Sequence, residues 1–177
     1  MRKCLLMFMM LVSSAVSAQS LPAAVVMDAP MLTLQGEGAM RWFGLKVYDI
    51  RLWTLAKKFT HAEHFALELV YDMNLNGKEI AEKSVELIRE QGQKDEAKLK
   101  RWGEAMAKVF PDIKKGDALI GVSIPGREAR FYSRDKFIAA VPDPEFAKAF
   151  FDIWLAESTT EPKVRARLLG NSGTSGK

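Results

Sequence analysis

The chain has 177 residues, of which 48% are hydrophobic and 27% are charged, and its formal net charge is +4. That length suits one domain with a single hydrophobic core. The basic residues form no stripe interleaved with aromatic residues, so the sequence argues against a nucleic-acid-binding protein.

Residues 1–18 have the pattern of a secretory signal peptide. Arg2 and Lys3 precede an apolar run at residues 5–12, and Val16 and Ala18 occupy the −3 and −1 positions of a cleavage site. An N-terminal membrane anchor is the alternative, but a bilayer span needs about 20 apolar residues. We therefore expect cleavage after Ala18, export to the periplasm and no stable membrane span.

Cleavage at this position would change the chemistry of the remaining chain. It would remove Cys4, the one cysteine, so the exported fold has to be held by its core without disulfides. It would also leave 24 basic residues against 22 acidic ones, which reduces the net charge to +2.

Strands are predicted to begin the exported chain. Residues 21–30 are expected to form an extended lead-in. Residues 31–35 and 39–53 are rich in apolar and aromatic side chains and suit strands, with a turn at Gly36-Glu37-Gly38. Residues 65–71 have the length and composition of a strand, although their Ala, Leu and Glu would also suit a helix.

Two helices are predicted next. The first covers residues 74–91, with Asn74 or Asn76 as its cap, and the second covers residues 94–110 and ends before Pro111. In the first helix one face is formed at helical spacing by Ile80, Ser84, Leu87 and Ile88.

The C-terminal part is predicted to return to strands and then to helices. Residues 117–124, 128–132 and 136–139 suit an antiparallel run. Asp143 and Pro144 mark the start of a helix at residues 145–156, which a short helix at residues 163–169 follows. The order of elements predicts one α+β domain at residues 19–170, and residues 171–177 are predicted to form a disordered tail.

Three segments together resemble the chalcone isomerase-like family, in its bacterial exported branch. FGLKVYDIRLW (residues 43–53) is similar to the family's G-[I/F]-x-V-Y-x-x-x-L-[Y/W] strand segment. LNGKEIAEK (residues 75–83) resembles the start of the helix that walls the plant enzyme's cleft, and FFDIWL (residues 150–155) resembles a helix of the bacterial branch. The resemblance implies an open-faced antiparallel sheet with helices packed on it and an apolar cleft between.

The resemblance also bears on chemistry. Plant members close a flavanone ring by intramolecular Michael addition, whereas related members bind fatty acids. The plant enzyme's catalytic arginine, threonine, tyrosine, asparagine and late-helix hydroxyl fall at or near Met31, Phe43, Ile80, Leu87 and Ile153. Stabilising an enolate needs cations and hydrogen-bond donors, which these residues lack. Plant-type chalcone isomerase activity is therefore not expected, and the cleft suits an apolar ligand.

The residues expected to bind the ligand are Arg41, Phe43, Ile80, Leu87, Ile153 and Trp154. Arg41 shares a strand face with Phe43, and it is interpreted either as a rim cation that pairs with a carboxylate or as an exposed strand arginine. Tyr48 is interpreted as a core residue in preference to a cleft residue.

No metal or cofactor is expected. His61 and His64 are the only histidines, and two ligands are too few for a metal site. The sequence thus predicts an exported protein that binds a small apolar or amphipathic ligand such as a fatty acid. Two alternatives stay open: an isomerase or lyase on an unidentified substrate, and an envelope interaction module with a packed centre.

Overall fold

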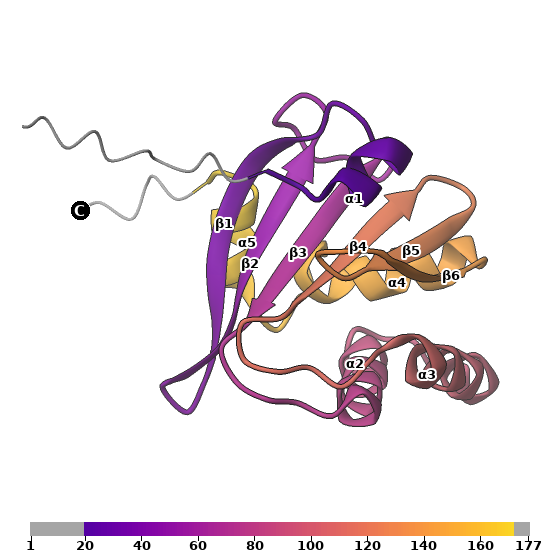
Figure 1. The fold of residues 1–177 in the computed structure, drawn as a ribbon. Helices are drawn as coiled ribbons and strands as arrows, with labels where there is room; N and C mark the ends of the chain where they lie inside the picture. The colour runs from indigo at the N-terminus through magenta and orange to yellow at the C-terminus, as the bar shows by residue number, and fades with distance from the viewer. Residues whose placement is uncertain (1–19, 172–177) are drawn as a thin grey trace, which may run out of the picture.

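The computed structural model describes residues 20–171, which form one sheet and five helices (Figure 1). The strands pair in the order β1-β2-β3-β4-β5-β6, and every pair is antiparallel. The predicted α+β class and open antiparallel sheet are therefore confirmed. The elements are α1 (Ala23–Asp28), β1 (Thr33–Trp42), β2 (Leu45–Thr54), β3 (Phe65–Tyr71), α2 (Gly77–Glu90), α3 (Glu96–Val109), β4 (Ala118–Ile124), β5 (Glu128–Tyr132), β6 (Phe137–Val141), α4 (Pro144–Leu155) and α5 (Pro162–Leu168).

The helices surround the sheet on three sides. In Figure 1, α4 and α5 lie behind the strands, α1 lies in front, and α2 and α3 lie beyond the lower strand ends. Helix α4 packs on β5, α5 on β1 and β2, and α2 on α3 and α4. We call the face under α4 and α5 the inner face and the face under α1 the outer face.

Strand alternation divides the core between these two faces, because successive side chains of a strand point to opposite sides. Phe65, Leu67 and Leu69 of β3 are buried with α2, α3 and α4 on the inner face. Ala66, between them, packs with Val25 of α1 on the outer face. The sheet is thus covered on both sides, which explains why nearly all of β3 is buried.

Helix starts follow the capping pattern of the sequence. The Asn76 side chain accepts the Lys78 backbone N–H at 2.9 Å, and the Asp143 side chain accepts the N–H groups of Glu145 and Phe146 at 2.9 and 3.0 Å. Each cap satisfies backbone donors that have no partner within the helix. From residue 65 onward the predicted helices and strands are all present, with ends shifted by at most three residues.

The predicted turn at Gly36-Glu37-Gly38 is wrong, because β1 continues through it, with only a shift of register between Leu34 and Gly36. The chain reverses instead at Phe43 and Gly44, where Gly44 has a φ of 82°. Gly36 serves packing: a Cβ there would lie 2.3 Å from the backbone oxygen of Arg167, at the end of α5. The glycine therefore lets α5 approach the backbone of β1.

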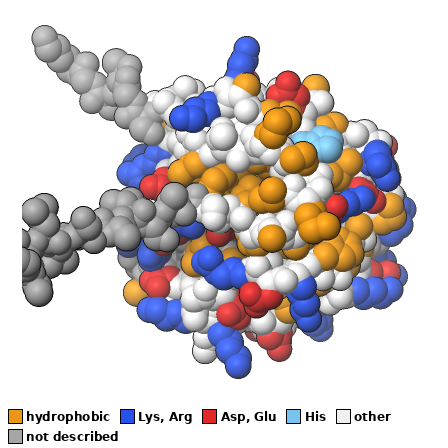
Figure 2. Space-filling view, turned by 45° about the horizontal axis from the view of Figure 1, so that its top comes forward, with side chains coloured by type: hydrophobic (Ala, Val, Ile, Leu, Met, Phe, Trp, Pro, Cys, Tyr) orange, Lys and Arg blue, Asp and Glu red, His pale blue; other side chains and the backbone are white. Residues whose placement is uncertain are grey.

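The predicted extended lead-in at residues 21–30 is also wrong, because it contains helix α1. Val25 of this short helix is fully buried and packs against Trp53 and Ala66, so burial of one apolar side stabilises the turn of helix. Its other side leaves Val26 and Met27 45% and 84% exposed. Figure 2, which brings the top of the molecule forward, shows apolar side chains gathered among charged ones on this face.

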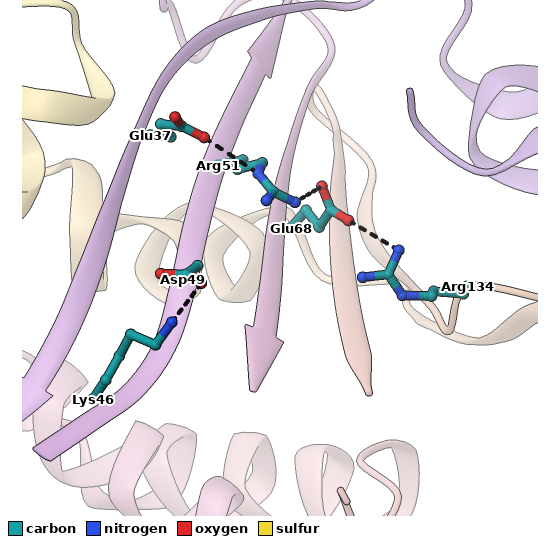
Figure 3. Close-up of polar contacts among 6 residues, drawn as sticks. All are labelled: Glu37, Lys46, Asp49, Arg51, Glu68 and Arg134. Carbon is teal, nitrogen blue, oxygen red and sulfur yellow. Dashed lines mark hydrogen bonds and ion pairs between the residues drawn. The ribbon is translucent and has the colours of Figure 1, made fainter. Parts of the chain in front are cut away.

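The outer face also carries a line of charges across neighbouring strands (Figure 3). Arg51 of β2 lies 3.4 Å from Glu37 of β1 and 3.3 Å from Glu68 of β3, and Glu68 lies 4.0 Å from Arg134. Glu68 is only 3% exposed, and a buried carboxylate needs such partners. These contacts account for Glu68 structurally, so we do not treat it as a functional group.

Two predicted segments lie partly or wholly outside the described residues. They are the signal peptide, residues 1–18, and residues 172–177 of the tail. Of the helices in the part that the structure describes, none has the length and apolar character needed to cross a membrane.

Candidate functional site

A cavity of about 680 Å³ lies between the inner face of the sheet, α2 and α4. Its floor is apolar. The strands contribute Leu67 and Leu69 of β3, Leu119 of β4 and Phe131 of β5, and Phe150 of α4 closes one side. All of these are at most 6% exposed, so these five residues offer a ligand only apolar surface.

Helix α2 supplies one wall of the cavity. Ile80, Ser84 and Leu87 line it, and their spacing places them on one side of the helix. The Ser84 hydroxyl donates to the Ile80 backbone oxygen at 2.8 Å, so its donor is already used within the helix. The wall that α2 presents is therefore effectively apolar.

Helix α4 and strand β2 supply the facing wall, through Ile153, Trp154 and Tyr48. The Trp154 Nε1–H donates a hydrogen bond to the Tyr48 hydroxyl oxygen at 3.0 Å. The Trp154 ring also packs edge-on against Phe150, with ring centroids 5.5 Å apart. Tyr48 packs against the core, as its interpretation from the sequence expected, and its side chain also lines the cavity.

Two tyrosines give the cavity its internal polar groups. Tyr48 and Tyr71 are direct cross-strand partners in β2 and β3, with ring centroids 5.4 Å apart. Tyr71 lines the cavity and is 3% exposed, yet its hydroxyl has no hydrogen-bond partner within residues 20–171. The free hydroxyl is positioned to meet a polar group of a ligand.

Burial raises the pKa of both phenols above their ordinary value. It raises the pKa of Tyr48 to about 12; the Trp154 hydrogen bond opposes this rise, and the nearby negative charge of Glu161 adds to it. Burial also raises the pKa of Tyr71, and the neighbouring Tyr48 adds to that rise. At neutral pH the two groups are therefore neutral hydroxyls that donate or accept hydrogen bonds.

Charged side chains line the mouth of the cavity. They are Glu79, Lys83, Glu86, Glu90 and Glu161, four glutamates against one lysine, with a net charge of −3. Lys83 Nζ lies 2.9 Å from the Glu86 carboxylate, so the cation is already paired. The negative charge at the mouth contrasts with the neutral floor.

The structure brings together four of the six residues that the sequence singled out: Ile80, Leu87, Ile153 and Trp154 all line the cavity. The expected place of Phe43 in the cleft is wrong. It occupies the turn between β1 and β2, with a φ of 47°, and is 90% exposed. Met40 and Trp42 line the cavity from this hairpin instead.

Arg41 lies outside the cavity lining as well. It is exposed, and its guanidinium donates to the Gly44 backbone oxygen at 3.3 Å. Its neighbours Met40 and Trp42 line the cavity. Successive side chains of a strand point to opposite sides of the sheet, so Arg41 is on the side away from the cavity. This position agrees with the interpretation of Arg41 as an exposed strand arginine.

The histidines do not contribute to the cavity. His61 Nε2 lies 2.9 Å from the Asp152 carboxylate of α4. This contact links the segment before β3 to helix α4. Within the described ranges, no three or more His, Cys, Asp or Glu side chains are arranged to hold a metal ion.

The chain is similar to known proteins over most of its length. A family model described as "Chalcone isomerase-like" matches residues 13–170. An uncharacterized protein of Haemophilus influenzae is 28% identical over 140 residues, which are 77% of this chain and 67% of the relative. The fold is similar to the crystal structure of a fatty-acid binding protein of Arabidopsis thaliana, with a TM-score of 0.61 and 12% identity over 80% of this chain and 88% of that one. At that identity the likeness shows the fold alone.

Proposed function

Because this chain belongs to the chalcone isomerase-like family and holds an apolar cavity, we propose that it binds a small apolar or amphipathic molecule there. The cavity carries this proposal. Its volume of about 680 Å³ falls within the range of about 300–1,000 Å³ that is typical of ligand sites. A fatty-acid binding protein with a similar fold is a precedent for an alkyl-chain ligand.

The proposed ligand-binding residues are the four that line the walls. Ile80 and Leu87 of α2 face Ile153 and Trp154 of α4 across the cavity. Ile80 and Leu87 are only partly buried in the empty protein. An alkyl chain between the two helices would remove this apolar surface from water, and each buried methylene contributes about 0.8 kcal/mol.

The polar groups of the cavity favour binding over plant-type ring closure. Closing a ring onto an enone needs donors or cations directed at the developing oxyanion. The lining offers two neutral tyrosine hydroxyls, the hydroxyl of Thr160 and a lysine that is paired with Glu86. The cavity also counts against an interaction module, for which we expected a packed centre. An isomerase or lyase that uses the tyrosines as donors is the second candidate.

We further propose that the protein acts after export. The pattern of residues 1–18 supports cleavage after Ala18 and a periplasmic site of action. The intact mass of protein recovered from the cell envelope tests this step. A mass that begins at Gln19 supports export with cleavage, and a mass that retains residues 1–18 contradicts it.

Blocking the cavity tests the binding proposal. Leu87→Arg places a long cation in the α2 wall, whereas Glu82→Arg places the same side chain on α2 outside the cavity lining. We expect Leu87→Arg to lose binding of a fluorescent alkyl-chain probe and Glu82→Arg to retain it. Equal binding by both variants, or no binding of any alkyl chain by the native protein, would refute the proposal.

A further inference from the structure

The mouth of the cavity has two rims, and both are acidic. On one rim, Glu79, Glu86 and Glu90 of α2 line the opening, at spacings of seven and four residues that place them along one side of the helix. On the other rim lies Glu161, immediately before α5. The carboxylates that line this cavity therefore come from two different parts of the chain.

This negative charge is not neutralised from within the protein. Lys83, the cation of the lining, pairs with Glu86 at 2.9 Å. Within residues 20–171, Glu79, Glu90 and Glu161 have no Lys, Arg or His nitrogen within 4.0 Å. A carboxylate head group would meet net repulsion here, and a cationic one would meet attraction.

Aromatic rings complete the same opening. Trp42 of β1 and the hydrogen-bonded pair Tyr48 and Trp154 line the cavity, and Glu161 lies close enough to Tyr48 for its negative charge to raise the pKa of that phenol. Aromatic faces attract cations, and Trp attracts them most strongly. Deeper in lies Tyr71, a residue that is 3% exposed, and its unpartnered hydroxyl offers an oxygen that accepts an N–H donor.

We propose that the ligand is an alkylammonium amphiphile, whose positively charged nitrogen sits among the mouth carboxylates and aromatic rings while its alkyl chain fills the apolar cavity. This inference rests on the proposed function and names the head group that the site selects. The acidic rims with their paired lysine, the aromatic rings and the unpartnered hydroxyl of the buried Tyr71 all line this one cavity.

A matched series of ligands tests the inference. Isothermal titration calorimetry at pH 7 would compare decylammonium and decanoate, each below its micelle concentration, with decanol below its solubility limit. We expect decylammonium to bind at least tenfold more tightly than decanoate, with decanol between them, and the preference to shrink as salt is raised. Decanoate binding as tightly as decylammonium, or more tightly, would overturn the inference while leaving the proposed function intact. No binding of any of the three would refute the proposed function itself.

Charge removal provides a second test with a matched control. The double variant Glu79→Gln, Glu161→Gln removes one unpaired carboxylate from each rim, and Glu82→Gln removes a carboxylate of α2 that lies outside the lining. We expect the double variant to reduce the preference for decylammonium over decanoate at least fivefold, with decanol affinity unchanged. Glu82→Gln should retain the full preference. An unchanged preference in the double variant would overturn the inference.

Discussion

Trp154 donates its indole N–H to the hydroxyl oxygen of Tyr48 at 3.0 Å, and this bond joins helix α4 to strand β2 across one end of the cavity. The two residues are 106 positions apart in the sequence. Because both side chains also line the cavity, the bond fixes the spacing between the sheet and α4 at the place where we propose that a ligand lies.

Removing the acceptor of this bond should destabilise the protein. Tyr48→Phe leaves the Trp154 N–H without its partner, and a buried unpaired donor costs about 1–3 kcal/mol. Urea unfolding would measure the loss. In a Trp154→Phe background no N–H is left to be orphaned, so Tyr48→Phe should then cost much less. Equal costs in the two backgrounds would show that the bond does not contribute to stability.

The glycines of β1 give a second prediction about packing. A Cβ at Gly36 would lie 2.3 Å from the Arg167 backbone oxygen, whereas a Cβ at Gly38 would meet ordinary contacts at 3.6 Å or more. Gly36→Ala should therefore push α5 away and cost at least about 1–3 kcal/mol. Gly38→Ala should be neutral or stabilise the strand by up to about 1 kcal/mol. Thermal unfolding of the two variants checks this, and similar melting temperatures would contradict it.

These glycines also show where the sequence is a poor guide. Gly-Glu-Gly is typical of a turn, and only the position of α5, which follows more than a hundred residues later, explains why β1 continues through it. The helices α2, α3 and α4 were predictable because their apolar periodicity, caps and terminators are local signals. Helix α1 was not, since its stability depends on burial of Val25 against the outer face.

Some parts of the candidate site were predictable from the sequence and others were not. Ile80 and Leu87 on α2, and Ile153 and Trp154 on α4, line the cavity. The family resemblance pointed to Ile80, Leu87 and Ile153, and helical spacing places Ile80 and Leu87 on one face of α2. The face of β1 was not predictable, because it depends on where the hairpin turns: a turn at Phe43 and Gly44 sends Met40 and Trp42 to the cavity. The acidic mouth was not predicted, because glutamates on a helix, such as Glu79, Glu86 and Glu90, carry no local signal that a cavity opens beside them.

The raised pKa of Tyr48 predicts a loss of stability at alkaline pH. The pKa rises from 10.0 to about 12 on folding, mainly through burial. The unfolded chain therefore loses this proton at lower pH than the folded protein, and the free energy of unfolding should fall as pH rises from 10 to 12. Urea unfolding at several pH values measures the slope. Tyr48→Phe should reduce this slope and leave the contributions of Tyr71 and Tyr132, whose pKa values are also raised. An unchanged slope would contradict the assignment.

The apolar walls predict that the protein does not catalyse chalcone cyclisation. Ile80 and Leu87 present no donor to an enolate, so flavanone formation with the protein present should equal the spontaneous rate. Chiral chromatography of the product provides the check. A saturable, protein-dependent product with one enantiomer in excess would contradict this expectation and favour the isomerase alternative.

Native mass spectrometry of the protein purified from its own host, followed by extraction and identification of any bound molecule, addresses ligand binding without assuming the ligand. We expect the native protein and Glu82→Arg to carry an amphiphile with an alkyl chain, and Leu87→Arg, whose cavity is blocked, to be empty. Recovery of the same molecule from Leu87→Arg would show that it is held elsewhere. A native protein that is empty after gentle purification and that binds no alkyl chain added back would contradict the assignment of the cavity as a ligand site.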